Sequence, residues 1–183
     1  MALPLGVPLT VQDVWDLPDD GHRYELLEGV LIVTPAPGAG HQTCVLELAV
    51  LLRSAVGTDD LVLLAPFDWV AGPQTLLQPD LLVAHRADLA AAGDKRLERP
   101  PILVVEVTSP STRMVDRGTK RLAFQAAGVP TYWLVEPDEP SLTVLRLRDG
   151  AYVEEARVTG DEPYEAREPF AVTVVPSRLR GGL

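Results

Sequence analysis

The chain has 183 residues, of which 46% are hydrophobic and 23% charged, and its formal net charge is −10. This length and composition predict one compact soluble domain over residues 1–183. The negative charge counts against strong, sequence-independent adhesion to DNA, because the phosphate backbone repels an acidic protein at long range.

The ends of the chain and its cysteine content favour a cytoplasmic protein. The N-terminal segment has no basic residue before its prolines, which does not fit a signal helix. No apolar run reaches the roughly 18 residues that a membrane span needs. The single cysteine, Cys44, cannot form an internal disulfide bond, and its apolar neighbours favour a buried, unreactive thiol.

The first elements along the chain are predicted to be a short helix and a hairpin. Residues 9–20 read as the helix, with Thr10 as a suitable N-cap. The pair Glu28-Gly29 then separates two strand-like runs, residues 23–27 and 30–34, and favours a tight turn between them.

The remainder of the chain alternates between helices and strands. Residues 41–56 carry apolar side chains at helical spacing, and Gly57 ends this helix. Residues 102–108 are almost wholly apolar, as is typical of a central strand covered on both faces. The other predicted elements are strands at 61–65, 68–71 and 80–85, helices near 87–92 and at 112–127, a strand at 132–135, a hairpin of 142–148 with 151–158, and a last strand within 170–175. This order predicts an α/β fold with a mixed β-sheet flanked by α-helices.

Two carboxylates stand inside hydrophobic runs. Asp80 precedes Leu81-Leu82-Val83, and Glu106 follows the apolar residues 102–105. A buried carboxylate is costly unless it is paired or binds a metal. We expect the two strands to be neighbours, because a sheet fixes the separation of such groups and their hard oxygens suit a divalent cation that promotes phosphodiester hydrolysis. The alternative is a Pro-Asp turn at Asp80 and a hydrogen-bonded core glutamate.

The following helix carries the basic residues. Lys120 lies four residues after Asp116, so both occupy one helix face. An ammonium group beside the carboxylates would stabilise charge on a phosphate or polarise the attacking water. The alternative is a surface ion pair. The neighbouring Arg113, Arg117 and Arg121 are predicted to contact phosphates, or else form a solvated helix face.

These residues resemble a known family. The pattern consists of Pro79-Asp80, Glu106 to Thr112, Asp116, Lys120, Gly128-Val129-Pro130 and Tyr132 to Val135, with earlier matches at residues 23–29 and at His41-Gln42. It is similar to the Uma-two family of restriction endonuclease-like proteins, within the PD-(D/E)XK nuclease superfamily. The resemblance spans residues 10–148 and implies a restriction-endonuclease-like core with hairpins at its N-terminal and C-terminal ends.

The resemblance also implies a metal centre. It makes Asp80 and Glu106 the ligands of Mg²⁺ or Mn²⁺. The superfamily has a lysine two residues after the glutamate, where this chain has Thr108. The resemblance therefore implies that Lys120 has taken over the role of that lysine, from a long side chain on the next helix.

Two further positions follow from the same resemblance. Superfamily members often add an acid, for which Glu25 and Glu47 are the candidates, and the family's Tyr-Glu-Leu pattern favours Glu25. His41 is a candidate for substrate binding or for a general base, with a structural role at a helix start as the alternative.

The function that we predict is a metal-dependent endonuclease that hydrolyses nucleic acid, with DNA as the expected substrate. The alternative is a catalytically inactive nuclease-fold protein with a binding or assembly role, which the acidic charge and the residue Thr108 favour. A homodimer is expected, since two-fold symmetry suits cleavage of both strands. Its predicted interface is an exposed edge of the hairpin about Asp149-Gly150, formed by Leu142, Val144, Leu145 and Leu147.

Overall fold

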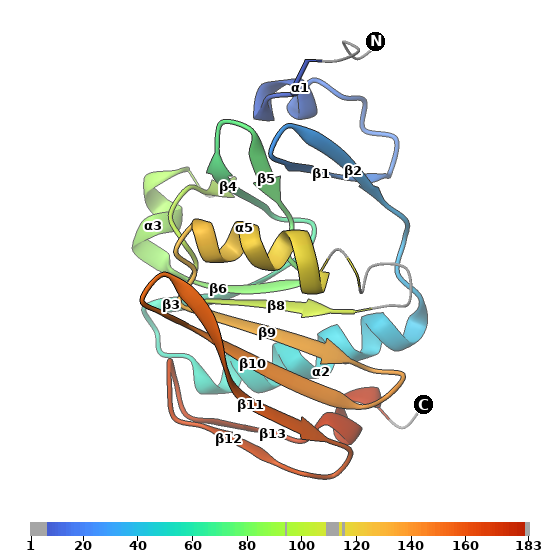
Figure 1. Cartoon of the computed structure of the whole chain (residues 1–183), viewed down its shortest axis with the longest axis vertical. Coiled ribbons are helices and arrows are strands. Elements are labelled where there is room, and N and C mark those ends of the chain that lie inside the picture. The colour runs from blue at the N-terminus through green and yellow to red at the C-terminus, as the bar shows by residue number, and fades with distance from the viewer. Residues whose placement is uncertain (1–6, 94, 109–113, 115, 182–183) are drawn as a thin grey trace.

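The computed structural model describes residues 7–93, 95–108, 114 and 116–181 (Figure 1). The strands are β1 (Arg23–Leu27), β2 (Val30–Thr34), β3 (Asp60–Leu64), β4 (Asp68–Gly72), β5 (Thr75–Leu77), β6 (Leu81–His85), β7 (Arg96–Leu97), β8 (Leu103–Val107), β9 (Thr131–Glu136), β10 (Ser141–Arg148), β11 (Ala151–Thr159), β12 (Tyr164–Ala166) and β13 (Val172–Val174). The helices are α1 (Val11–Trp15), α2 (Ala39–Ala55), α3 (Arg86–Ala91), α5 (Arg121–Ala126), a π-helix η1 (Asp116–Lys120) and a 3-10 helix η2 (Pro176–Arg180).

Two mixed sheets form the body of the protein. One has six strands in the order β11-β10-β9-β8-β6-β3, and the other has five in the order β2-β1-β5-β4-β7. The pair β8–β9 is parallel in the first sheet and the pair β4–β7 in the second, while the other pairs are antiparallel. The predicted α/β fold with flanking helices and hairpins near both ends is confirmed. The second sheet and its short strand β5 were not anticipated.

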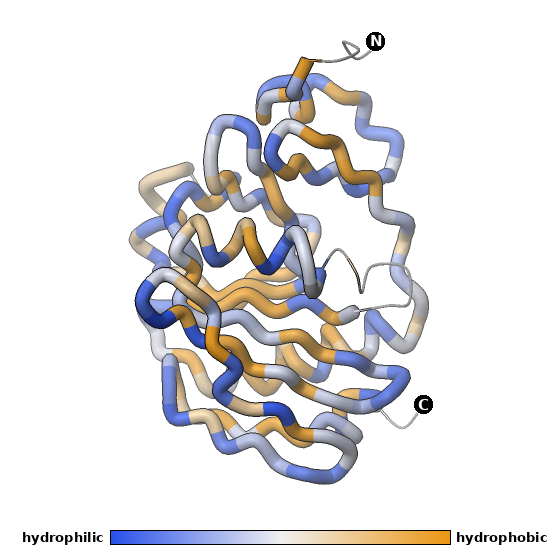
Figure 2. Tube along the Cα trace, viewed as in Figure 1, coloured by the Kyte–Doolittle hydropathy of each residue, from blue (hydrophilic) through white to orange (hydrophobic). Residues whose placement is uncertain are grey.

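The six-stranded sheet is covered on both faces. Side chains from Leu103, Val105 and Val107 of β8 pack in one core cluster with α2, whereas Val104 packs in a second cluster with Phe124 of α5. Figure 1 shows α5 in front of this sheet and α2 behind it, and Figure 2 shows hydrophobic residues along its central strands. Because strand side chains alternate, Glu106 lies on the α5 face, in phase with Val104.

Both predicted hairpins form as the turn residues indicate. Glu28 and Gly29 have φ angles of 50° and 79°, and Asp149 and Gly150 have 51° and 79°. Two successive positive φ angles are those of a type I′ turn, whose twist matches paired strands. In β1 and β2 the turn brings Glu25 opposite Ile32.

The C-terminal hairpin lies at an edge of the six-stranded sheet, but the leucines predicted to form that edge do not lie there. Strand β10 lies between β9 and β11, and its Leu142, Val144 and Leu145 side chains are buried in the core. The open edge of this sheet belongs to β11 instead. The leucine-rich strand β10 is buried because the same chain supplies both of its neighbouring strands. The homodimer itself stays a prediction.

The helices differ from their predicted bounds at particular points. Thr10 caps α1 in a reciprocal capping box with Asp13, as expected, but the helix ends at Trp15. Helix α2 begins at Ala39, two residues before the predicted start. The predicted helix at 112–127 includes a π-helix followed by α5, and its residues 112, 113 and 115 lie outside the described part of the chain. None of the helices in the described residues is long and apolar enough to cross a lipid bilayer.

Candidate active site

Asp80 and Glu106 come from neighbouring strands. In the antiparallel pair of β6 and β8, Leu81 lies opposite Val105 and Leu82 opposite Val104. Asp80, directly before β6, therefore faces Glu106, and the backbone N–H of Val107 donates to Asp80 Oδ2 at 2.9 Å. The prediction that these two strands are neighbours is confirmed.

Asp80 is a buried carboxylate that is held by cationic partners. Arg23 Nη1 lies 3.1 Å from Oδ1, and His41 Nε2 lies 3.0 Å from Oδ2. Burial acts to raise the pKa of Asp80, but the hydrogen bond to His41 and the charges of His41 and Arg23 outweigh it and lower the pKa to about 2. Asp80 is therefore ionised at neutral pH.

Lys120 reaches the same cluster from the π-helix. Its Nζ lies 2.9 Å from Glu106 Oε1 and 3.0 Å from Glu25 Oε2, and it is 3.8 Å from Asp116 Oδ1. The residue is only 4% exposed, so it is not a surface ion pair. Burial lowers the pKa of Lys120, but the carboxylates of Glu106 and Glu25 outweigh that effect and raise it, so the ammonium stays charged.

Burial acts in the opposite sense on the glutamate. Glu106 is 2% exposed, and desolvation raises its pKa well above the usual value, with Lys120 opposing and Asp80 adding to the rise. The cluster thus holds one acid that ionises readily and one that resists ionisation. A cation placed between them would favour the charged form of both.

Of the two candidates for the additional acid, only Glu25 lies in the cluster. Glu25 is fully buried, and its Oε1 accepts the backbone N–H of Gln78 at 2.8 Å. Glu47 lies instead on α2 near the C-terminal Gly181. The five-stranded sheet carries Glu25 to the site through β1.

The π-helix explains how a residue so far from β8 reaches it. A π-helix is rare and is frequently found at functional sites. Tyr132 on β9 donates its hydroxyl to the backbone carbonyl of Asp116 at 3.0 Å, which fixes the first residue of η1. Lys120, the last residue of η1, is thereby aimed at the sheet.

The arginines that are predicted to contact phosphates are described only in part, and their contacts with phosphate stay a prediction. Arg121 Nη2 donates to the backbone carbonyl of Tyr152 at 3.3 Å, so this guanidinium is partly engaged with the protein. Arg113 and the side chain of Arg117 lie outside what the structure describes. His41 is in the first turn of α2, and its contact with Asp80 places it in the cluster.

Arg23 is the cluster member that the sequence analysis did not assign a role. Besides its bond to Asp80, it lies 3.5 Å from Glu25 Oε2. The signal that would have found it is strand alternation, since Arg23, Glu25 and Leu27 share one face of β1 and Leu27 lies in the core next to α5.

The comparisons with known proteins bear on the family and the fold. A family model described as "Uma2: Putative restriction endonuclease" matches residues 11–175. The chain belongs to the Uma2 family. The solved structure of a "putative nuclease belonging to DUF820 from Anabaena variabilis ATCC 29413" is similar to this Uma2 protein with a TM-score of 0.70 and 20% identity, over 96% of this chain and 93% of that one. This likeness shows that the fold is shared. No curated protein matches the chain.

The donor set of the Uma2 site fits a hard divalent cation in its chemistry. The carboxylate oxygens of Asp80, Glu106 and Glu25 are the ligand type that Mg²⁺ and Mn²⁺ prefer. Glu25 Oε2 is buried and makes no hydrogen bond, although Lys120 lies 3.0 Å away as an ion partner. Among the described residues, no three acidic, histidine or cysteine side chains already surround one ion position. The side chains of Arg23 and Lys120 contact these carboxylates instead.

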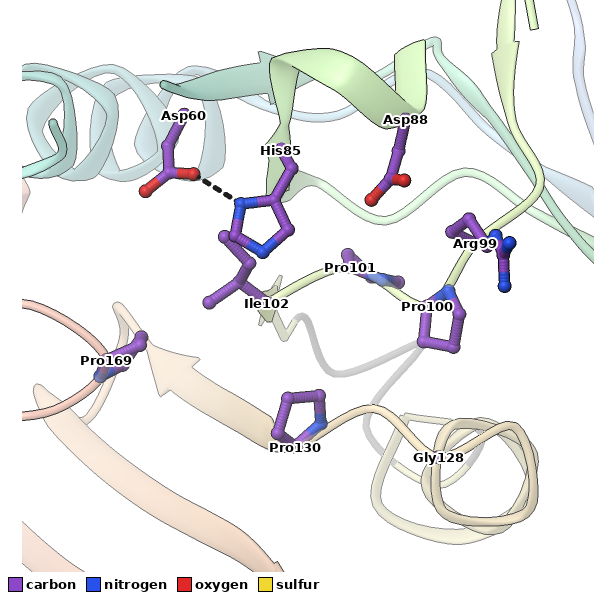
Figure 3. A pocket seen from close by; sticks show the side chains of 10 residues that line it. All are labelled: Asp60, His85, Asp88, Arg99, Pro100, Pro101, Ile102, Gly128, Pro130 and Pro169. Carbon is purple, nitrogen blue, oxygen red and sulfur yellow. Dashed lines mark hydrogen bonds and ion pairs between the residues drawn. The ribbon is translucent and has the colours of Figure 1, made fainter. Parts of the chain in front are cut away.

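A separate cavity lies at the other end of β6. It has a volume of about 610 Å³, and Figure 3 shows Asp60 and His85 on its wall, joined by a 2.7 Å contact, with Asp88 and Arg99 nearby. The strand β6 runs from this cavity to Asp80, so the cavity is not part of the carboxylate cluster. None of the residues of the carboxylate cluster lines this cavity.

The lowered pKa of Asp80 predicts a specific acid response. The carboxylate's pKa falls from 3.8 to about 2 on folding, so it contributes about 2 kcal/mol of stability above pH 4, which is lost as the pH falls toward 2. The raised pKa of Glu106 acts in the opposite direction and above pH 4.5, outside this window. Urea unfolding from pH 5 to 2 should show the stability of wild type and of Asp80→Asn converging by this amount. A difference in stability between the two proteins that stays constant from pH 5 to 2 would contradict the lowered pKa of Asp80.

Proposed function

We propose that this Uma2 protein is a Mg²⁺- or Mn²⁺-dependent endonuclease that hydrolyses phosphodiester bonds of nucleic acid, with DNA as its substrate. One observation carries the proposal. Asp80 and Glu106 face each other across two paired strands, and Lys120 from the following π-helix lies 2.9 Å from Glu106 Oε1. Two carboxylates on neighbouring strands, with a lysine that reaches them from the π-helix, match the requirements of phosphodiester hydrolysis.

Asp80 and Glu106 hold the metal in this proposal. When bound, the ion supplies Lewis-acid stabilisation of the phosphate and lowers the pKa of a water molecule. In the reaction the water oxygen bonds to phosphorus and releases a proton to solvent, the bond from phosphorus to the leaving sugar oxygen breaks, and that oxygen takes up a proton from solvent. Lys120 stabilises the negative charge that builds up on the phosphate, and Glu25 keeps the ammonium in position through its 3.0 Å contact.

The lysine position is consistent with this role. In the usual superfamily arrangement the lysine would stand where this chain has Thr108, a buried residue whose hydroxyl makes no hydrogen bond. The Lys120 ammonium arrives at Glu106 from another element, and its long flexible stem makes such a relocation possible. Charge, rather than sequence position, is what the phosphate requires.

Substrate contacts form the outer part of the proposal. Arg113, Arg117 and Arg121 follow Glu106 in the chain near the π-helix, and with His41 they are our candidates for binding the phosphates that flank the cleaved bond. The net charge of −10 makes such a local basic patch necessary for any approach to DNA. In a homodimer a two-fold axis would relate two such sites, which suits cleavage of both strands.

A catalytically inactive nuclease-fold protein is the second candidate. The observation in its favour is that Asp80 already accepts from Arg23, His41 and the backbone of Val107. The positive charge of Arg23 beside Oδ1 opposes a metal ion at that oxygen. The two candidates therefore differ in whether the folded protein binds a divalent cation at all.

Isothermal calorimetry with MnCl₂ separates these candidates. We expect wild type to bind one Mn²⁺ per chain, because the ion recovers the charge attraction of Asp80 and Glu106, and we expect Asp80→Asn to show no binding at millimolar metal. Circular dichroism establishes that both proteins are folded. A wild-type protein that binds no Mn²⁺ would leave the inactive binding protein as the better description.

A further inference from the structure

Arg23 occupies an unusual place in the carboxylate cluster. It is the first residue of β1 in the five-stranded sheet, yet its guanidinium lies 3.1 Å from Asp80, which precedes β6 in the six-stranded sheet. It also lies 3.5 Å from Glu25 Oε2, and its side chain is 19% exposed. A single arginine therefore neutralises acids from both sheets at a position that still reaches solvent.

Asp80 has two oxygens with unequal partners. Its Oδ2 is held by His41 and by the backbone N–H of Val107, whereas Arg23 is the one partner of Oδ1 among the residues that the structure describes. Backbone donors cannot leave without unfolding β8, but a partly exposed arginine side chain can rotate away. Of the two oxygens, Oδ1 is thus the one that a metal ion could take over.

A metal and this guanidinium exclude each other at Oδ1. Both are cations that require the same oxygen, and like charges at contact distance repel strongly where water is scarce. The guanidinium also has capacity for a new partner, because Arg23 Nε is buried and makes no hydrogen bond within the described part of the chain. A planar guanidinium beside a metal-bound site matches the paired oxygens of a phosphate.

We propose that Arg23 is the counter-ion of the metal-free site and that a divalent cation displaces its guanidinium from Asp80 Oδ1. The released guanidinium then binds the phosphate that enters next to the metal. The Arg23 guanidinium thus changes its partner from the Asp80 carboxylate to the phosphate of the substrate. The inference rests on the proposed metal site at Asp80 and Glu106, and it assigns to Arg23 a role in the order of binding, with metal before phosphate.

A purely structural arginine would behave differently. If Arg23 only fastened the two sheets, removing it would loosen Asp80 and weaken metal binding. If Arg23 is a competing counter-ion, removing its charge strengthens metal binding, because the carboxylate no longer has to give up a partner. The sign of the change therefore distinguishes the two roles.

The experiment compares Mn²⁺ binding by calorimetry in wild type, Arg23→Gln and Arg157→Gln. Arg157 is the matched control, since it pairs with Glu154 on exposed β11 and its loss changes the net charge equally. We expect Arg23→Gln to bind Mn²⁺ roughly tenfold more tightly and Arg157→Gln to bind as wild type does. At saturating Mn²⁺, thymidine 5′-monophosphate should bind Arg23→Gln roughly tenfold more weakly than wild type.

A second measurement covers the case in which Arg23→Gln does not fold. In NMR spectra of the wild-type protein, the Arg23 Nε–H resonance, assigned by its loss in Arg23→Lys, should shift on addition of Mg²⁺. Unaltered or weaker Mn²⁺ binding in folded Arg23→Gln, or an Arg23 resonance that saturating Mg²⁺ leaves in place, overturns this inference while the metal site stands. Unchanged nucleotide binding overturns the phosphate half. A wild-type protein that binds no metal overturns the proposed function as well.

Discussion

Replacing Asp80 by asparagine is expected to lower Mn²⁺-dependent cleavage of supercoiled plasmid DNA at least roughly a thousandfold, since a bound metal provides several kcal/mol of transition-state stabilisation. Asparagine keeps the shape of the side chain and one oxygen for the N–H of Val107. The substitution removes the negative charge that a divalent ion needs. Gel analysis of plasmid nicking and linearisation measures the effect.

The matched control for this experiment is Asp60→Asn. Asp60 lies at the opposite end of the β3–β6 pair, where it contacts His85 much as Asp80 contacts His41. It therefore reproduces the loss of one acid beside one histidine, away from the cluster. We expect this variant to cleave as wild type does. Equal cleavage by Asp80→Asn and wild type would remove Asp80 from the mechanism.

Replacing Lys120 by methionine is expected to reduce cleavage by roughly 10²- to 10³-fold, which is the typical effect of losing one preorganised charge at a reacting centre. The same change should lower the free energy of unfolding by about 3–5 kcal/mol, because it leaves buried carboxylates without their cation. Lys120 is buried and contacts Glu106 and Glu25. Cleavage assays and urea unfolding measure the two effects separately.

A double variant separates stability from catalysis. In Lys120→Met combined with Glu106→Gln, a buried carboxylate that lost its partner is also replaced, so stability should recover in part. Cleavage should not recover, because Glu106 is a proposed metal ligand. Lys95→Met is the control, since Lys95 is the other lysine of the chain and is exposed. Wild-type cleavage by Lys120→Met would show that the ammonium only stabilises the fold.

The cluster combines stability and chemistry in one set of contacts. Glu25 and Arg23 come from the five-stranded sheet, Asp80 and Glu106 from the six-stranded sheet, and Lys120 from the π-helix between β8 and α5. Buried ion networks are costly to keep and costly to break, so each removal is expected to affect folding as well as turnover. Paired controls are therefore essential to interpret any single substitution here.

Much of the fold could be predicted because its signals are local. Type I′ turns require two successive residues that accept a positive φ angle. The pairs Glu28-Gly29 and Asp149-Gly150 therefore predict the two turns. The apolar run over residues 102–108 predicted a central strand, and its acidic residue stood out against that run. The neighbouring strands of Asp80 and Glu106 followed from the requirement that buried charges be compensated.

The sequence by itself determined most of the elements and the two facing carboxylates, since turn residues, apolar periodicity and the cost of burying charge act over short stretches of chain. The candidate lysine came from the family resemblance. Only the tertiary structure decided which distant groups surround them. Arg23 meets Asp80 across 57 positions of sequence, Glu25 rather than Glu47 meets Lys120, and a π-helix rather than a regular helix aims that lysine. These contacts depend on how two sheets pack and on which face each side chain takes, and no local pattern records that arrangement.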